Sequence, residues 1–219
     1  MSKIVPLFPL PLVVYPSAKY MLHIFEERYK KMIAFVRTLD QEFGIIPVKD
    51  SEPARIGSLV KVIRIVKTNE DGSFDIMIEG TRRFVLRSIL QHEDGYFMGE
   101  ADGYEDIGSA AFTDLEDEAR HKFEEIVKKA EIKLEDEFWD NLNSAKLKSY
   151  KLAEKSGLTL KQQQDLLILQ SEGERLFFLI EHLDYINGFL DNREVVRQIV
   201  LNDGYINKDT FKQDREEEE

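Results

Sequence analysis

The chain has 219 residues, of which 42% are hydrophobic, and this length and composition suit one or two folded domains. It contains no cysteine, which excludes a disulfide framework, a thiol nucleophile and a cysteine-ligated metal. The formal net charge of −12 disfavours nucleic acid as a partner, because binding to phosphate backbones depends on clustered lysine and arginine.

The amino terminus does not have the pattern of an export signal, since a single lysine is followed by prolines instead of an uninterrupted apolar run. No apolar run in the sequence reaches the ~18 residues that a membrane-spanning helix requires. We therefore expect a soluble, cytoplasmic protein that has no membrane as a partner.

Residues 4–16 contain nine apolar residues and four prolines, so this segment is expected to be buried without being helical. Proline lacks a backbone donor, which restricts such a run to edge strands, strand ends and turns. A helical pattern follows the segment. Its expected apolar face consists of Phe25, Tyr29, Met32, Ile33 and Val36.

Short apolar segments, with β-branched residues over 59–66 and two-residue alternation over 74–80, then predict strands over residues 43–48, 59–66, 74–80, 81–86 and 96–101. Residues 51–53 are expected to form a turn or loop. The Asp71-Gly72 pair predicts a hairpin turn between the second and third of these strands, and Gly80 predicts a bulge or bend. Several short strands with one early helix indicate a small mixed β-barrel.

From residue 111 the pattern becomes helical and predicts a bundle of four or five helices. Four apparent capping boxes precede apolar-periodic runs, at Thr113…Glu116, Thr159…Gln162, Ser171…Glu174 and Asp191…Glu194. The expected apolar faces contain Phe123, Ile126 and Val127; Phe138, Leu142, Ala145 and Leu152; Leu166, Leu167 and Leu169; Leu176, Leu179, Ile180, Leu183 and Ile186; and Val195, Val196, Ile199 and Val200.

These patterns give an α+β fold class with a β-barrel domain over residues 1–106 and an α-helical bundle domain over residues 111–204. Gly157 is expected to end a helix. Residues 205–219 finish in four consecutive glutamates, a composition that predicts a disordered acidic tail.

Several segments together resemble the amino-terminal domain of Lon proteases. They are residues 6–10 (PLFPL) and 22–29 (LHIFEERY), then 57–60 (GSLV), Asp71-Gly72 and 78–84 (IEGTRRF), in the family's order. Residues 153–183 resemble the family's helical subdomain, so the likeness extends over about residues 3–200. It implies a PUA-like barrel followed by helices, in a region that recognises unfolded or tagged substrates and supports hexamer assembly.

Motifs for catalysis are missing from the sequence. There is no Gly-x-x-x-x-Gly-Lys-Ser/Thr loop for phosphate, no His-Glu-x-x-His and no Gly-x-Ser-x-Gly. The four histidines, His23, His92, His121 and His182, are too scattered along the chain to indicate a metal site. We expect no catalytic residues, no metal and no cofactor, and we interpret the protein as a non-enzyme.

The leading interpretation is a protein-binding or peptide-binding module whose partners are unfolded or extended polypeptide segments, together with a protease or chaperone. The candidate binding residues are Phe25, Tyr29, Arg82, Arg83 and Trp139, because aromatic and arginine side chains dominate interfaces. Core packing is the favoured alternative for Phe25 and Tyr29, and a solvated face for Arg82 and Arg83. Trp139 is equally compatible with a contact surface and with a core.

Two other interpretations of function remain. PUA-like barrels in general include RNA binders and small-ligand binders, so this class is the alternative. Residues 152–159 also resemble the turn of a DNA-binding helix-turn-helix, after which residues 161–164 would read DNA. The plainer explanation of that segment is a glycine-capped turn between two helices of the bundle.

Overall fold

The computed structural model describes residues 2–49, 52–108 and 112–188. The chain divides into two compact units, Met1–Ile107 and Gly108–Glu219. The first unit is built from strands and one helix, and the second from helices, so the expected α+β class is confirmed. The predicted helical face at residues 195–200, the last apparent capping box and the acidic tail all lie outside the described residues.

The first unit contains seven strands and one helix within the described residues. They are β1 (Lys3–Leu10), β2 (Lys19–Ile24), α1 (Glu27–Thr38), β3 (Phe43–Lys49), β4 (Glu52–Pro53), β5 (Ile56–Thr68), β6 (Phe74–Gln91) and β7 (Phe97–Gly103).

The paired strands follow the order β1-β7-β6-β5-β3, and the path returns to its start through a parallel pairing of β3 with β1. The sheet therefore curls on itself as expected of a small mixed barrel, although this last pairing spans only four residue pairs. β2 and β4 lie outside this path, with β2 paired to β6 and β4 paired to β3.

The prolines of β1 occupy positions where the strand changes neighbours. Residues 3–7 pair with β7 and residues 7–10 pair with β3, so only Leu7 has recorded partners on both sides. Pro6 pairs only with β7 and Pro9 only with β3, so on its other side each proline has no described neighbouring strand that would require a backbone donor. This arrangement explains how a proline-rich segment joins a sheet.

β6 is one continuous strand, so the prediction of two strands separated at Gly80 was wrong. The expected irregularity at that point is present, because the register with β5 shifts between the pairs Leu59–Arg82 and Val60–Gly80. The predicted hairpin turn is also present. Gly72 has a φ of 76°, and its N–H donates to the carbonyl of Asn69 at 3.1 Å. Residues 52–53, expected in a loop, form the short strand β4.

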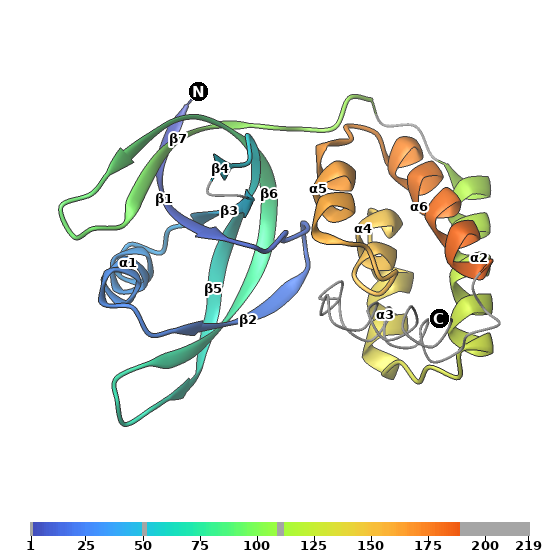
Figure 1. Cartoon of the computed structure of the whole chain (residues 1–219), viewed down its shortest axis with the longest axis horizontal. Helices are drawn as coiled ribbons and strands as arrows, with labels where there is room; N and C mark the ends of the chain where they lie inside the picture. The colour runs from blue at the N-terminus through green and yellow to red at the C-terminus, as the bar shows by residue number, and fades with distance from the viewer. Residues whose placement is uncertain (1, 50–51, 109–111, 189–219) are drawn as a thin grey trace, which may run out of the picture. The chain divides into compact units, whose positions relative to one another are not determined.

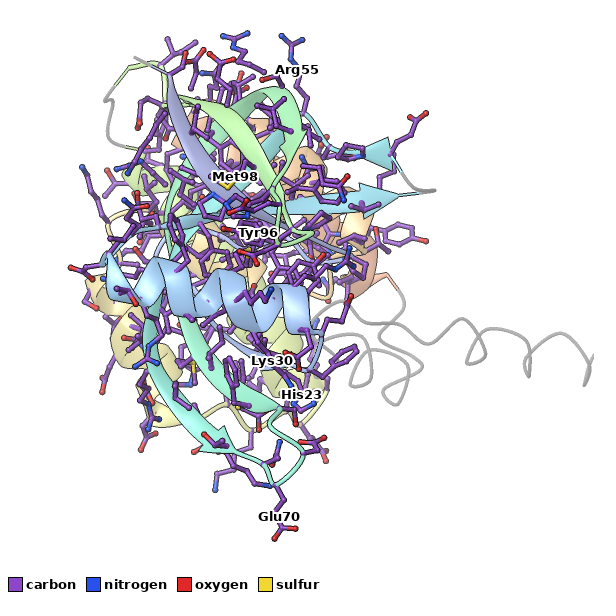
Figure 2. The ribbon with its side chains drawn as sticks, turned by 90° about the vertical axis from the view of Figure 1, so that its left-hand side faces the viewer. His23, Lys30, Arg55, Glu70, Tyr96 and Met98 are labelled. Carbon is purple, nitrogen blue, oxygen red and sulfur yellow. The ribbon has the colours of Figure 1, made fainter. Side chains whose placement is uncertain are left out.

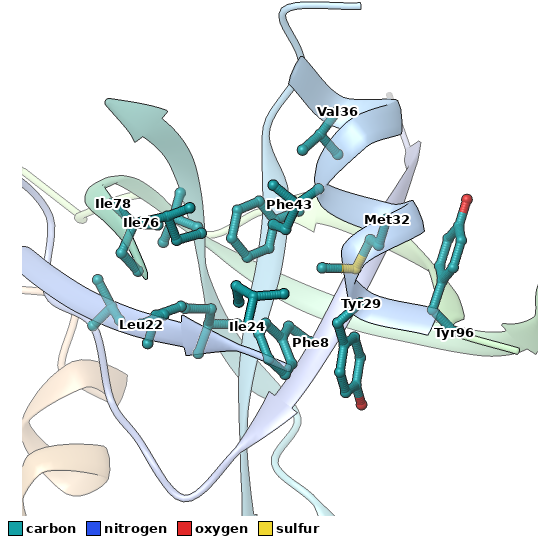
Figure 3. Packing of buried hydrophobic residues seen from close by; sticks show 14 of the residues in the cluster. Phe8, Leu22, Ile24, Tyr29, Met32, Val36, Phe43, Ile76, Ile78 and Tyr96 are labelled. Carbon is teal, nitrogen blue, oxygen red and sulfur yellow. The ribbon is translucent and has the colours of Figure 1, made fainter. Parts of the chain in front are cut away.

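Helix α1 supplies one wall of the larger core. Its buried side chains, Tyr29, Met32, Ile33 and Val36, pack with Phe8 and Phe43 and with the inward side chains of β2 and β6 (Figure 3). Burying each such side chain contributes about 1.5–3 kcal/mol. Figure 1 shows α1 between the β5–β6 and β6–β7 hairpins. Lys31 Nζ lies 2.7 Å from Asp94 Oδ1 in the second hairpin.

The expectation that Phe25 belongs to the buried helical face was wrong. α1 begins at Glu27, and Phe25 is 62% exposed. The physical reason is that residue 25 continues the alternation of β2, in which Leu22 and Ile24 point inward while Met21 and His23 are exposed.

The second unit contains five helices within its described residues: α2 (Thr113–Lys129), α3 (Asp136–Ser144), α4 (Lys148–Ala153), α5 (Leu160–Ile168) and α6 (Glu172–Asn187). The predicted faces of α2 and α6 are buried. The face expected from Phe138 to Leu152 is divided between α3 and α4. Lys148 Nζ donates to the carbonyls of Leu142, Asn143 and Ala145, where α3 ends.

Of the three apparent capping boxes in the described residues, only Thr159…Gln162 forms. Thr159 Oγ1 accepts from the Gln162 N–H at 3.3 Å, and the Gln162 side chain accepts from the Thr159 N–H at 3.0 Å. Thr113 is inside α2 and does not cap it, and Ser171 is the N-cap of α6 without a side-chain cap bond. The expectation that Gly157 ends a helix was wrong, since α4 ends at Ala153 with Glu154 as its C-cap, and Gly157, with a φ of 65°, lies in the turn that leads to α5.

Candidate functional site

The two aromatic candidates of the first unit have different surroundings. Tyr29 is buried, its ring stacks on Phe8 at a centroid distance of 4.0 Å, and the Arg28 guanidinium lies 4.6 Å from the ring centroid. Burial raises the pKa of its hydroxyl. Phe25 is exposed and stacks on the His23 ring at 5.8 Å. Tyr29 is therefore a core residue, and Phe25 is available for contact.

The adjacent arginines occupy opposite faces of β6. Arg82 is half-exposed, and its Nη2 lies 2.6 Å from Glu42 Oε2. Arg83 is buried, its Nη2 lies 2.5 Å from Asp106 Oδ1, and its guanidinium lies over the Tyr104 ring. The expectation that both occupy a solvated face was wrong for Arg83, because Asp106 and Tyr104, from the segment after β7, cover its guanidinium.

Trp139 is half-buried in α3 of the second unit. Its ring makes edge contacts with Phe138 at 5.3 Å and with Phe123 at 6.1 Å. It is thus part of a small aromatic cluster that leaves some of its surface exposed. The five candidates do not form one cluster within the first unit, since Phe25, Arg82 and Arg83 lie on separate parts of it and Trp139 belongs to the other unit.

Phe25 directly follows β2, which lies at an edge of the sheet. Among the described residues β2 pairs with β6 alone, so one side of this strand is a sheet edge. Met21 and Phe25 are each 62% exposed on its outward side. The register with β6 runs without interruption from the Lys19–Glu79 pair to the Ile24–Phe74 pair. A regular, exposed strand edge of this kind is a template for pairing with another chain.

The outward side chains of β2, β6 and β5 form three rows across the sheet, which we call the ribbon face. Strand pairing gives the rows Lys19–Glu79–Lys61, Met21–Met77–Arg64 and His23–Asp75–Lys67. In the middle row two methionines lie side by side next to Arg64, and in each outer row a carboxylate stands between two nitrogen-bearing side chains. Glu79 Oε2 lies 3.0 Å from Lys61 Nζ, and Asp75 Oδ1 lies 2.6 Å from His23 Nδ1.

Figure 2 shows this part of the unit in relation to α1. His23 and Lys30 lie on the side of α1 that faces the hairpin ending near Glu70, and Tyr96 and Met98 lie on the other side. His23, a member of the ribbon face, thus lies on the same side of α1 as the β5–β6 hairpin.

The far half of β5 also has an exposed edge, but it is irregular. Register shifts leave Ile63 and Val66 without partners in β6, and these residues are 42% and 40% exposed. Such bulges twist a strand and interrupt its ladder, which disfavours pairing at this edge. Of the two edges, β2 is the one suited to receive another strand.

Sequence reasoning found Phe25 but missed Met21 and Met77. The signal available in the sequence was the two-residue alternation of residues 19–25, which is typical of a strand. It was obscured because the outward positions are themselves partly apolar. Methionine suits a surface that must accommodate different side chains, since its unbranched chain is flexible and polarizable.

In the segment that resembled a DNA-reading helix, Lys161 is exposed and pairs with its own helix, while two glutamines contact residues packed beside that helix. Lys161 Nζ lies 2.6 Å from Asp165 Oδ2, Gln162 contacts the His182 ring, and Gln163 donates to the Leu158 carbonyl at 3.0 Å. These contacts fit the plainer interpretation, a turn between two packed helices.

Within residues 2–49, 52–108 and 112–188, no three His, Asp or Glu side chains are grouped so as to hold a metal ion. None of the helices described is both long and apolar enough to cross a membrane.

The family model described as the ATP-dependent protease La (LON) substrate-binding domain matches residues 4–185. Among solved structures, a Lon N-terminal domain protein from Xanthomonas campestris is 26% identical with a TM-score of 0.66, and the match covers 82% of this chain and 98% of that chain. The N-terminal domain of a Mycobacterium avium complex Lon protease is 17% identical with a TM-score of 0.64, covering 83% and 98%, and shows a shared fold. No curated protein matches the chain.

Proposed function

The chain belongs to the family of the Lon substrate-binding domain, and from this we propose that it is a non-catalytic module that binds extended polypeptide segments along the edge of β2. The observation that carries the proposal is the combination of a regular edge strand, which pairs with β6 alone among the described strands, with two exposed apolar side chains, Met21 and Phe25.

The proposed binding mode is strand addition. A polypeptide lying beside β2 forms main-chain hydrogen bonds with the strand, which do not depend on the sequence of the ligand. Its alternate side chains contact the outward residues of β2, where Met21 and Phe25 provide apolar anchors. An unfolded chain meets both requirements, because it exposes its backbone and its apolar side chains together.

Within this proposal, Tyr29, Arg82 and Arg83 have other roles, and Trp139 packs in the aromatic cluster of the second unit. Tyr29 and Arg83 stabilise the fold from the interior of the first unit, and Arg82 is bound to Glu42. Any ATP-dependent cleavage of a bound polypeptide is then assigned to a partner protease, for which this module selects or holds the segment. From the family match we also propose that the protein acts in the cytoplasm.

The proposal is tested by fluorescence anisotropy with a labelled, apolar-rich peptide. Met21→Lys is expected to weaken binding about tenfold, equivalent to ~1.4 kcal/mol, because it replaces an apolar anchor of the edge strand with a charge. Phe25→Ser is expected to have a similar effect.

Leu90→Lys is the matched control, since Leu90 is also a strand residue with 62% exposure, in the part of β6 that pairs with β7. This variant is expected to bind within about twofold of the unchanged protein. Equal losses for Met21→Lys and Leu90→Lys, or no peptide binding by the unchanged chain, would contradict the proposal.

A further inference from the structure

The ribbon face carries positive charge on an acidic protein. Its three rows contain four cationic side chains, Lys19, Lys61, Arg64 and Lys67, and two carboxylates, Glu79 and Asp75. The whole chain has a formal net charge of −12. The sign of the charge on this face is therefore opposite to that of the protein.

The carboxylates of the face are already engaged, and three of the cations are not. Glu79 is bound to Lys61, and Asp75 to His23. Within the part of the chain that the structure describes, no ion pair or side-chain hydrogen bond is recorded for Lys19, Arg64 or Lys67. An approaching carboxylate thus finds free cationic partners.

The position of Lys19 relates this charge to the edge of β2. Lys19 and Met21 are two residues apart, so both point outward, about 7 Å from one another along the strand. A strand added beside β2 places one of its own outward side chains next to each of them. Opposite charges attract and like charges repel at such cross-strand positions.

We propose that this edge selects acidic segments in which an Asp or Glu lies two residues from a large apolar residue. The carboxylate is held by Lys19 and the apolar side chain by Met21 and Met77. This inference rests on the proposed function and assigns the substrate class of the same site. Arg64 and Lys67 lie two strands from the edge of β2, about 10 Å away, and extend the attraction within roughly one Debye length.

The same charges disfavour other partners of the edge. A basic segment brings a second cation to Lys19. A second copy of this chain, paired through β2 about a two-fold axis at Met21, sets Lys19 opposite His23 instead of a carboxylate. An extended acidic-apolar segment places its carboxylate beside Lys19 and its apolar side chain beside Met21.

The test uses three labelled peptides that are identical except at the residue two positions from a central leucine, which is Glu, Gln or Lys. Anisotropy titrations of the full chain are expected to give an affinity for the Glu peptide about fivefold higher than for the Lys peptide, with Gln between them. The difference is expected to shrink as salt is raised.

Lys19→Glu is expected to invert this order, whereas Lys3→Glu, a charge reversal at an exposed lysine of β1, should leave it unchanged. Equal binding of the three peptides with retained sensitivity to Met21→Lys would overturn the acidic preference and leave the proposed function standing. Loss of all peptide binding would overturn both.

Two further outcomes would also overturn the inference. One is binding of a single-stranded RNA oligonucleotide that Lys19→Glu abolishes while the peptides do not bind, which would identify the cations as a nucleic-acid site. The other is a dimer in sedimentation that Met21→Lys dissociates, which would show that a second copy covers the edge.

Discussion

Gly80 is hydrogen-bonded to the segment that connects β1 to β2. The N–H of Gly80 donates to the Ala18 carbonyl at 2.9 Å, and its carbonyl accepts from the Ser17 N–H at 2.8 Å. A Cβ at residue 80 would overlap the carbonyl oxygen of Tyr15, a backbone atom that cannot rotate away. Glycine is therefore required here for the close approach of two backbones.

We predict that Gly80→Ala lowers the free energy of unfolding by at least about 2 kcal/mol, since the backbone at Tyr15 must move away from its buried position. Urea unfolding followed by circular dichroism measures this loss. Gly103→Ala, near the end of β7, is the control. There the nearest atom to the added Cβ is Glu105 Oε1 at 3.5 Å, an ordinary contact. A loss for Gly80→Ala no greater than that for Gly103→Ala would contradict the prediction.

The residue-level expectations failed where a side chain's direction depends on partners distant in sequence. The pair Arg82-Arg83 reads as one basic site, yet Arg83 is buried against Asp106, 23 residues further along the chain. Phe25 fits a helical period as well as a strand period, and only the start of α1 at Glu27 decides between them. Local periodicity contains neither piece of information.

At the scale of elements, apolar periodicity located most helices and strands, while polar patterns were less reliable. The apparent capping box at Ser171 did not form, and α6 is instead held by buried polar contacts. Glu172 accepts from the Ser149 hydroxyl at 2.6 Å, and Arg175 Nη2 lies 3.0 Å from Glu172 Oε2. The incomplete alternation of β5 has a similar cause, because bulges at Ile63 and Val66 break the two-residue period.

His182 joins α6 to the turn after α4 and to α5. Its Nε2 lies 2.8 Å from the Ser156 carbonyl, and its Nδ1 lies 3.2 Å from Gln162 Nε2. A neutral ring satisfies both partners, by donating to the carbonyl and accepting from the amide. Burial lowers the pKa of His182 below 6.5, and the bond to Ser156 opposes this only in part.

This lowered pKa predicts that the second unit loses stability in mild acid. The unfolded chain binds a proton at His182 more readily than the folded chain, so the contribution is fully present above pH 6.5 and is lost as the pH falls toward the folded pKa. The slope is at most about 1.4 kcal/mol per pH unit. Urea unfolding at several pH values from neutral to mildly acidic measures it.

His182→Gln is expected to flatten this slope, because glutamine does not titrate. The matched control is His121→Gln, at an exposed position of α2, which should leave the slope unchanged. An unaltered pH dependence in His182→Gln would show that other groups are responsible.

At the scale of the whole molecule, a strand-rich part followed by helices could be predicted from the sequence, but the strands β2 and β4 and the closure of the sheet could not. The parallel pairing of β1 with β3 joins segments about forty residues apart, and no local pattern indicates which strands meet. The edge at β2 could not be foreseen for the same reason, since an edge is defined by the neighbours that a strand lacks. The candidate site thus emerged from topology, with Phe25 as its only predicted member.

The division into two units leads to a prediction for separate fragments. Every strand pairing that the structure describes joins residues within 3–103, and the two hydrophobic clusters of this unit are formed by residues from Val5 to Ala101. We therefore predict that fragment 1–107 folds alone, unfolds cooperatively in urea and binds the Glu peptide within about threefold of the full chain.

The end of this fragment must include the contacts of Arg83. Asp106 and Tyr104 lie beyond β7 and contact the Arg83 guanidinium, which is buried at 4% exposure. A fragment ending at residue 103 keeps every strand but loses both contacts, so it should be less stable by about 2–3 kcal/mol, because a buried charge then lacks its carboxylate. Equal stability of the two fragments would show that Arg83 does not depend on residues 104–106. An unfolded fragment 1–107 would show that the first unit requires the second.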